Sequence, residues 1–158
     1  MGFNFLDKYD RSFLNKSLFL TAKVLYHGTT LTYYNERMPH LSQYFFHAAV
    51  GLSGSKNKEV WFETNVKKAI DWACAFALRF KDKPVLLIVS TRSLQDLRRT
   101  VGHNWPYHRA DKVPAKDIIM IELEFTSEKW KKRLFLSAWY DLTDACKEKI
   151  ILAQRKLS

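Results

Sequence analysis

The sequence predicts an α+β fold with a split, mostly antiparallel β-sheet core, flanking helices and a helical C-terminal extension. Three observations favour it. Strand-like and helix-like segments follow one another in the order strand, strand, helix, strand, strand and then helices. The aliphatic run Pro84–Ser90, bounded on both sides, is typical of a central strand. The chain has 158 residues, 47% of them apolar, which is enough for one domain with a real core.

The first fifty residues contain one clear strand. Residues 1–20 mix charged with large apolar side chains, which fits a short amphipathic helix or a packed arm. Lys23–Tyr26 is typical of a strand, and we expect it to end abruptly at the turn signal His27–Thr30. Leu31–Ala49 is rich in Tyr, His and Phe, which predicts a helix broken at Pro39, or an ordered loop.

The next segment predicts a strand followed by a helix. Gly51–Asn57 is expected to be a flexible connection, and Glu59–Phe62 a short strand. Thr64 or Asn65 then caps a helix whose small residues would let it lie close to a sheet. Its apolar positions recur at the three-and-four spacing of a buried helical face: Val66, Ala69, Ile70, Ala73, Ala77 and Phe80.

The second half of the chain is expected to add one strand and several helices. Ser93–Thr100 predicts a short helix, and Val101–Lys112, which has no periodicity, predicts a loop or an irregular edge. Ile118–Phe125 is a clear strand pattern. Ser127 is expected to start a basic helix, and Leu136–Leu157 a second one.

The charge balance favours a polyanionic partner. The chain has 26 Lys and Arg against 16 Asp and Glu, a net charge of +10. Such an excess favours nucleic acid first and an anionic membrane surface second. Half of it lies in Lys129–Ser158, which contains eight basic and three acidic residues. The alternative is a solvated helical face that keeps the protein soluble.

Several classes of protein are excluded by the sequence. Its apolar runs are far shorter than the roughly 20 residues that cross a bilayer. The two cysteines, Cys74 and Cys146, are expected to be reduced core thiols. No signal-peptide layout is present, so we expect a cytoplasmic protein, although a toxin or effector delivered by a dedicated machine would look the same. Neither a phosphate-binding glycine loop nor a metal-binding His or Cys cluster is evident.

The segment Leu25-Tyr26-His27-Gly28-Thr29-Thr30 is the main candidate for a functional site. A strand that ends in His-Gly-Thr places an imidazole at the strand terminus. The bare backbone of Gly28 would allow a planar ligand to approach closely, and the hydroxyl of Thr29 can donate or accept a hydrogen bond nearby. In isolation the same residues are also typical of an ordinary His-Gly turn with a capping threonine.

Three further blocks follow this segment in a fixed order. They are Glu59–Ala73, with the sequence EVWFETNVKKAIDWA, then the Lys-Pro-Val strand Lys83–Leu87, and then the Val-Pro segment Val113–Ile118. The succession resembles the ADP-ribosyltransferase-like superfamily, in the branch of diphtheria toxin and the poly(ADP-ribose) polymerases. The resemblance covers roughly Val24–Phe125 and is most specific in the first two blocks. It implies the split, mostly antiparallel sheet of that superfamily.

The resemblance also implies roles for individual residues and NAD⁺ as a substrate. His27 would donate a hydrogen bond to, or accept one from, a ribose hydroxyl of NAD⁺, and the backbone of Gly28 would hold the nicotinamide carboxamide. Thr29 would support the adenosine side of the pocket. Trp61, where the family usually has Tyr, would stack on the nicotinamide ring. Thr64 falls near the hydroxyl that the family carries after its second strand.

One family feature is missing. The polymerase and toxin branches place a Glu shortly before the last strand, where it would stabilise the ribosyl cation. The corresponding stretch, His103–Lys112, contains no Glu, and Asp111 is its one carboxylate. His108 and Arg109 in this stretch are the further catalytic candidates that the resemblance leaves. Carboxylates that could supply a charge from elsewhere in the chain are Glu63 and Glu122.

These observations predict an NAD⁺-dependent ADP-ribosyltransferase that acts on a nucleic acid or protein acceptor and releases nicotinamide. Residues 1–126 would form the catalytic domain, and residues 127–158 a basic helical extension packed on it, through which nucleic acid could bind. One alternative is an RNA 2′-phosphotransferase, a near relative that lacks the Glu. This family carries a basic residue before its Lys-Pro-Val strand, which is Arg79 here, and Arg79 would then bind a phosphate of the substrate. The other alternative is a catalytically degenerate module of the same fold that binds nucleic acid or protein.

Overall fold

The computed structural model describes residues 23–41, 45–46, 60–93, 98–100, 107–110, 113–114, 118–132 and 137–158. For 37–41, 45–46, 60–61, 93, 98–100, 107–110 and 113–114 it describes the backbone alone. The predictions for residues 1–20 and Gly51–Asn57 lie outside the described residues. The helices and strands are β1 Val24–Thr30, α3 Leu31–Leu41, β2 Phe45–Phe46, β3 Val60–Phe62, α4 Val66–Phe80, β4 Pro84–Ser90, β5 Arg98–Thr100, β6 Tyr107–Ala110, β7 Val113–Pro114, β8 Ile118–Glu122 and α5 Asp144–Leu157. The 3₁₀ turns are η2 Thr91–Ser93, η4 Glu128–Lys132 and η5 Ala138–Asp141.

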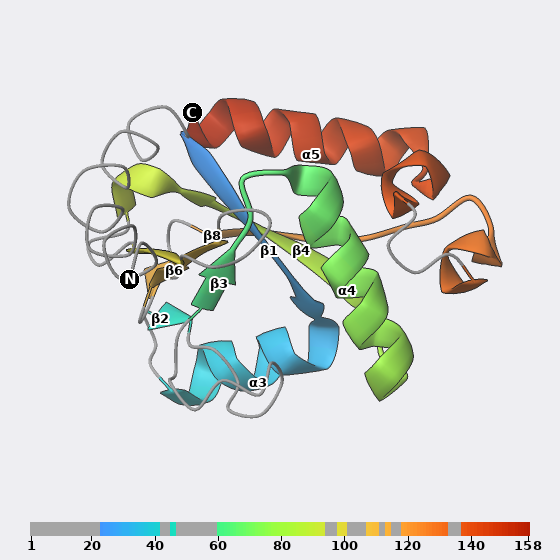
Figure 1. The fold of residues 1–158 in the computed structure, drawn as a ribbon, viewed down its shortest axis with the longest axis horizontal. Coiled ribbons are helices and arrows are strands. Elements are labelled where there is room, and N and C mark those ends of the chain that lie inside the picture. Colours follow the sequence, from blue (N-terminus) through green and yellow to red (C-terminus); the bar gives the residue numbers. More distant parts are fainter. Residues whose placement is uncertain are drawn as a thin grey trace, which may run out of the picture.

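A three-stranded antiparallel sheet in the order β1-β4-β8 forms the centre of the molecule (Figure 1). β4 lies in the middle, and all seven of its residues are buried. Because a strand with neighbours on both edges and layers on both faces meets no water, its continuous aliphatic sequence is the expected one. The α+β class and the central position of Pro84–Ser90 are therefore confirmed.

A second three-stranded sheet, in the order β3-β6-β5, meets the first, within the described residues, at the bridge between Tyr26 and Glu63. The backbone N–H of Tyr26 in β1 donates to the carbonyl of Glu63, directly after β3, at 2.9 Å. The N–H of Glu63 donates back to the carbonyl of Tyr26 at 2.8 Å. β2 and β7 form a separate two-stranded pair. Every strand pair in the described part of the chain is antiparallel.

Helix α4 packs on β1 and β4 through small side chains. Its N-cap is Asn65, whose side chain accepts a hydrogen bond from the N–H of Lys67 at 2.9 Å, and it ends at Lys81 in the left-handed conformation. The predicted cap at Asn65 is confirmed, and so is the buried face at Ala69, Ile70, Ala73 and Ala77. The prediction that Phe80 belongs to this face is wrong, because its ring at the end of the helix is exposed.

Helix α5 belongs to the same core as α4 and the sheet. Its N-cap Thr143 accepts a hydrogen bond from the N–H of Cys146 at 3.1 Å. Cys146, Ile150 and Ala153 then pack into one hydrophobic cluster with β4 and α4. Close to its end, the side-chain amide of Gln154 donates to the phenol oxygen of Tyr26 at 2.7 Å, which connects α5 to β1. In Figure 1, α5 extends along the top of the molecule and α3 lies at the bottom.

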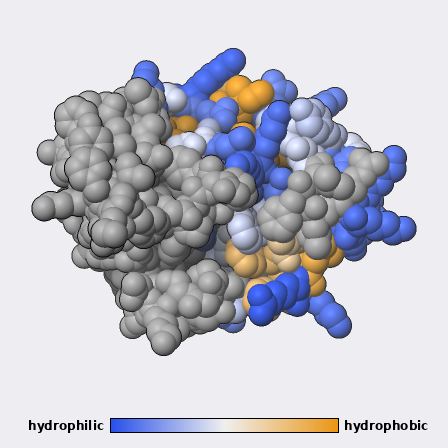
Figure 2. Space-filling view, in the orientation of Figure 1, coloured by the Kyte–Doolittle hydropathy of each residue, from blue (hydrophilic) through white to orange (hydrophobic). Residues whose placement is uncertain are grey.

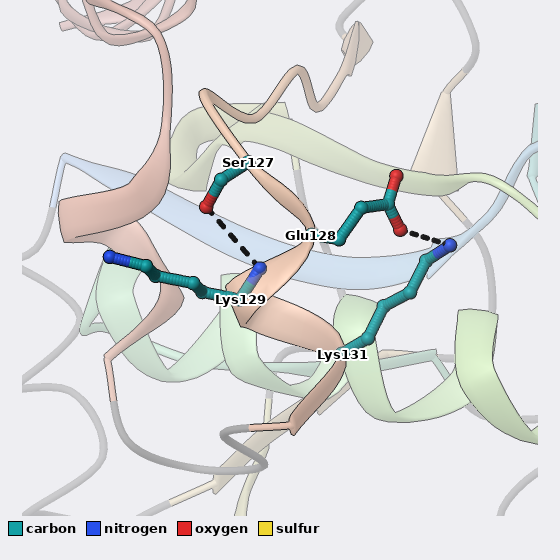
Figure 3. A network of polar contacts seen from close by, with 4 residues as sticks. All are labelled: Ser127, Glu128, Lys129 and Lys131. Atoms are coloured by element: carbon teal, nitrogen blue, oxygen red, sulfur yellow. Dashed lines mark hydrogen bonds and ion pairs between the residues drawn. The ribbon is translucent and has the colours of Figure 1, made fainter.

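The described residues between β8 and α5 form the 3₁₀ turns η4 and η5, where the sequence predicts a basic helix from Ser127 and the first part of a second helix, Leu136–Leu157. In η4, Ser127 accepts a hydrogen bond from the N–H of Lys129, and Lys131 forms an ion pair with Glu128 (Figure 3). Trp130 is buried there and stacks on Phe125. The predicted helix Leu136–Leu157 is interrupted, because the cap at Thr143 begins α5 only after η5 has ended.

A buried carboxylate holds η5 against α4. Asp71 of α4 accepts a hydrogen bond from the N–H of Ala138 at 2.9 Å. Burial raises the pKa of the Asp71 carboxyl, and the hydrogen bonds from the backbone of Ala138 and Ser137 oppose that shift. The first residue of η5 is thereby tied to the middle of α4.

Three further predictions need correction. β1 does not end before His27–Thr30, since pairing with β4 sustains the strand through Thr30. α3 continues past Pro39 to Leu41. The predicted helix Ser93–Thr100 is wrong, because the chain there enters β5, and the predicted loop Val101–Lys112 contains β6. β5 and β6 are stabilised by pairing with each other and with β3, which no local pattern reveals.

Both cysteines are buried and free, as expected. Burial raises the pKa of Cys74 to about 12, so this thiol stays protonated and unreactive at neutral pH. Among the described helices, none has the length and apolar character needed to cross a membrane. The described side chains also contain no cluster of three or more His, Cys, Asp or Glu residues suited to a metal ion.

Candidate active site

Three strands from distant parts of the sequence meet where the two sheets join. β1 carries His27, and the bridge at Tyr26 places β3 beside it. β3 pairs in turn with β6, so that Trp61 lies opposite Arg109 and Phe62 opposite His108. Neighbouring strands are about 4.8 Å apart. The structure therefore brings the backbone positions of the four predicted catalytic residues, His27, Trp61, His108 and Arg109, onto three adjacent strands.

The hydrogen-bonding pattern of β1 shows which of its backbone groups face β4. The N–H of Leu31 donates to the carbonyl of Lys83 at 2.9 Å, and the N–H of Thr91 donates to the carbonyl of Lys23 at 3.1 Å. In an antiparallel pair, hydrogen-bonded positions alternate along each strand. The odd-numbered residues of β1 therefore bond to β4, and the even-numbered residues turn their N–H and C=O groups toward β3.

Gly28 lies on this second edge of β1, two residues beyond the bridge. Tyr26 uses its N–H and C=O to pair with Glu63, and among the described strands β1 and β3 form no second bridge. The N–H and C=O of Gly28 thus face the space between the two sheets. They offer one donor and one acceptor side by side, which matches the hydrogen-bonding pattern of a carboxamide.

The α-carbon of Gly28 faces α4 rather than open space. A Cβ built on it would lie 2.0 Å from the carbonyl oxygen of Ala69 and 2.7 Å from the nitrogen of Ala73. The expectation that a ligand approaches the bare face of this glycine is therefore wrong, because the helix backbone occupies that face. Gly28 is itself buried, so a ligand between the sheets could meet only the edge of its peptide groups.

His27 and Thr29 lie on the opposite face of β1 from Gly28, since side chains alternate along a strand. The imidazole of His27 is half-buried and makes an edge contact with the ring of Phe62, with centroids 6.1 Å apart. Thr29 is buried. The contact between His27 and Phe62 shows that β1 and β3 share this face as well as an edge.

Glu63, which the sequence offered as a possible source of charge, forms a polar pair with Trp72, which the sequence did not assign to the site. The carboxyl of Glu63 is 6% exposed and accepts a hydrogen bond from the indole N–H of Trp72 in α4 at 3.2 Å. Trp72 in turn stacks on Phe76. Because Glu63 pairs directly with Tyr26, its side chain lies on the α4 face of β1, opposite to His27. Trp72 belongs to the block Glu59–Ala73, but nothing local in that block distinguishes it from an aromatic residue of the core.

Burial raises the pKa of Glu63 from its ordinary value of 4.5 to about 7. The positive charge of Lys68 and the hydrogen bond from Trp72 oppose this effect without cancelling it. Between about pH 4.5 and about pH 7, the carboxyl of Glu63 is therefore protonated in the native state and ionised in the unfolded chain. Ionisation of Glu63 should destabilise the fold as the pH rises through this window.

Replacement of Glu63 by glutamine tests this destabilisation, since glutamine keeps the acceptor for Trp72 but cannot ionise. At about pH 8 Glu63→Gln is expected to be more stable than the wild type by about 2 kcal/mol, and at about pH 4 the two should agree. Denaturant unfolding at both pH values measures the difference. The exposed carboxylate Glu124 provides the control: Glu124→Gln should change stability by less than about 0.5 kcal/mol at either pH. A variant that is no more stable at the higher pH would contradict the expectation.

Other predicted residues lie away from His27. Thr64 is exposed in the turn between β3 and α4. Arg79 is exposed near the end of α4, about 9 Å of helix rise beyond Ala73, with its guanidinium 5.4 Å from the ring centroid of Phe80. Glu122 is exposed on β8, which β4 separates from β1 by about 10 Å in total.

The described residues also line a groove of about 1180 Å³. It lies at the end of the sheet, between the last turn of α4, the start of β4 and the segment after β8, and its lining includes Leu78, Asp82, Leu123 and Trp130. Of the residues that the sequence singled out, Glu122 lines it, whereas His27, Gly28 and Thr29 do not. The groove and the edge of β1 are therefore separate features.

No protein-family model and no curated protein matches this chain. The candidate site is consequently argued from its own geometry: a strand edge at Gly28 that pairs with no described strand, an imidazole on the preceding residue, and two further strands beside it.

Proposed function

We propose that this protein is an NAD⁺-dependent ADP-ribosyltransferase with a macromolecular acceptor. The observation that carries the proposal is the edge of β1 at Gly28, where an N–H and a C=O face the space beside β3 next to His27. A pair of three-stranded antiparallel sheets that meet at one bridge supports the split-sheet architecture of the superfamily that the sequence resembles.

The residues at this edge suit the nicotinamide end of NAD⁺. The C=O and NH₂ of the carboxamide complement the N–H and C=O of Gly28. His27 follows Tyr26 on the same strand and would orient a ribose hydroxyl by a hydrogen bond. Trp61, on the neighbouring strand β3, stands two residues before Glu63 and so at a position of the face opposite to His27. An aromatic surface for the pyridinium ring would therefore come from that side of the strand edge.

NAD⁺ supplies the chemistry itself: its C1′–N bond breaks, nicotinamide leaves with the electron pair, and an acceptor atom bonds to C1′ and loses its proton. The protein's task is to hold the leaving group and fix the ribose. Glu63 lies on the opposite face of β1 from His27, and Glu122 lies two strands away. The proposal therefore assigns the ribose contact to His27 and gives neither carboxylate that role.

Nicotinamide release from NAD⁺ tests the proposal. The wild type is expected to release nicotinamide, and His27→Ala to lower the rate by about 100-fold, because a misoriented ribose loses the benefit of positioning. The exposed residue Lys129 provides a control, since Lys129→Ala should retain the rate. Circular dichroism should show that both variants are folded. Equal release by wild type and His27→Ala would show that the site assignment is wrong.

The same assay separates the second candidate, an RNA 2′-phosphotransferase. The position of both Glu63 and Glu122 away from His27 favours it, because that reaction does not use the family's glutamate. In this case nicotinamide release would require a 2′-phosphorylated RNA. Release with NAD⁺ alone, or with an unphosphorylated acceptor, would favour the ADP-ribosyltransferase.

A further inference from the structure

An exposed tyrosine is held in a fixed position at the start of the C-terminal region. Tyr140 in η5 is 66% exposed, which is unusual for a large aromatic side chain. The ammonium of Lys67, in the first turn of α4, donates a hydrogen bond to its phenol oxygen at 3.0 Å and lies 4.9 Å from the ring centroid. The two contacts keep the ring extended at the surface instead of packed against the core.

A second lysine adds positive charge beside this ring. The ammonium of Lys147 in α5 lies 5.7 Å from the ring centroid of Trp139, the residue before Tyr140. The hydrogen bond and charge of Lys67, followed by the charge of Lys147, lower the pKa of the Tyr140 phenol. Two lysines thus place positive charge beside the half-buried Trp139 and the exposed Tyr140.

Two carboxylates follow Tyr140 in the sequence. Asp141 is half-buried, and its charge adds to the effect of burial in raising the pKa of the Cys74 thiol. Asp144 is exposed in the first turn of α5, where a negative charge interacts favourably with the helix dipole. Neither acid contributes to the shift in the pKa of Tyr140.

We propose that Lys67, Tyr140 and Lys147 form a contact site for single-stranded nucleic acid, in which a base stacks on the tyrosine ring and the lysines bind flanking phosphates. Such binding combines an exposed aromatic ring with nearby cations, here Lys67 at the ring of Tyr140 and Lys147 at the adjacent Trp139. The inference deepens the proposed function, because it names the class of acceptor, and it rests on that proposal for the transfer step. Lys67 and Ala69, which packs against Gly28, share the first turns of α4, so the acceptor would be held near the candidate active site.

Two other partners fit this surface less well. An acidic peptide would pair with the lysines but offers no regular series of rings to stack on Tyr140. An anionic membrane would need an apolar face beside the lysines, whereas Figure 2 shows a small apolar patch over α5, bordered by hydrophilic side chains, and a larger one lower down, around the end of α4. Ile151 and Leu152 are the exposed aliphatic residues of α5, but Glu148 lies between them on the outer face of the helix and would be repelled by anionic lipid.

Binding of a fluorescently labelled single-stranded RNA of about 12 nucleotides, measured by anisotropy, tests the proposal. The wild type should bind, with an affinity that falls as salt rises from roughly 50 to roughly 200 mM. Tyr140→Ala should weaken binding by about fivefold or more, whereas Tyr140→Phe, which keeps the ring, should bind within about twofold of the wild type. Lys147→Gln should weaken binding and lower the slope of log affinity against log salt by about 0.7.

Lys149→Gln is the matched control, because it removes the same charge from the same helix two residues further on, around its other side. It should bind RNA within about twofold of the wild type. The proposal is overturned if Tyr140→Ala binds normally, if the Lys149 variant loses as much affinity as the Lys147 variant, or if polyglutamate displaces the RNA as well as an unlabelled oligonucleotide does. The last result would identify an acidic polypeptide as the partner.

Nicotinamide release measured on the same proteins separates this inference from the proposed function. Tyr140→Ala should retain the acceptor-independent release of nicotinamide, since Tyr140 does not lie at β1. RNA binding that depends on Tyr140, without any release of nicotinamide, would support the contact site and contradict the proposed enzyme activity. Release that depends on His27, without RNA binding, would support the enzyme activity and contradict the contact site.

Discussion

Replacement of Gly28 by alanine is expected to lower the free energy of unfolding by about 3 kcal/mol, because the new methyl group would overlap the backbone of α4. The added carbon would lie 2.0 Å from the carbonyl oxygen of Ala69. In a strand, alanine is otherwise preferred over glycine by about 0.5–1 kcal/mol. The sign of the effect therefore depends entirely on the contact with the helix. Denaturant unfolding of the two proteins measures it.

A second substitution distinguishes this clash from other causes. The conflicting atom belongs to the backbone, so truncation of the side chain in Ala69→Gly should not restore the stability of Gly28→Ala. The single variant Ala69→Gly should itself lose about 1 kcal/mol, from helix propensity. If Gly28→Ala were as stable as the wild type or more so, α4 could not lie as close to β1 as described.

Replacement of Ile150 by alanine is expected to destabilise the protein by about 3 kcal/mol. Ile150 is fully buried and packs, through α5, into the same cluster as α4 and β4. A cavity there would be surrounded by parts of the chain from both sides of the expected boundary at residue 127. The loss should appear in one cooperative unfolding transition, detected alike by tryptophan fluorescence and by far-ultraviolet circular dichroism.

Leu152 provides the control on the same helix, because it is 57% exposed and Leu152→Ala should change stability by less than about 0.5 kcal/mol. Two separate transitions, or an Ile150→Ala variant as stable as the Leu152 variant, would show that α5 is an independent extension of the domain instead of a part of its core.

The sequence predicted best the elements with a complete local pattern. Pro84–Ser90 has an uninterrupted aliphatic run between breakers, and α4 has a cap at Asn65 followed by small apolar residues at helical spacing. β4 is buried throughout and α4 buries the face from Ala69 to Ala77, so composition and environment agree. The strand at Ile118–Glu122 was also found from its aliphatic run, although it proved shorter than expected and is mostly half-buried.

Elements that depend on partners were missed. The extension of β1 through Gly28 depends on pairing with β4. From the sequence alone, His-Gly-Thr is interpreted as a turn, because nothing local shows that a helix packs against the glycine within a strand. β6 contains His108 and Arg109 in a segment without periodicity and becomes a strand through pairing with β3. Within the candidate site, the order of motifs anticipated that the strands of His27 and Trp61 would meet. The burial of Glu63 beneath Trp72 depends on the path of α4 and could not be anticipated.

The hydrogen bond between Gln154 and Tyr26 has a consequence for events at β1. Tyr26 directly precedes His27, so the last turn of α5 restrains the strand that carries the candidate site. Whatever occupies that site and tightens β1 must also slow the fraying of this terminal turn, and by reciprocity a frayed turn must weaken occupancy. The last turn of α5 is therefore coupled to the strand that carries His27, although the two are far apart in the sequence.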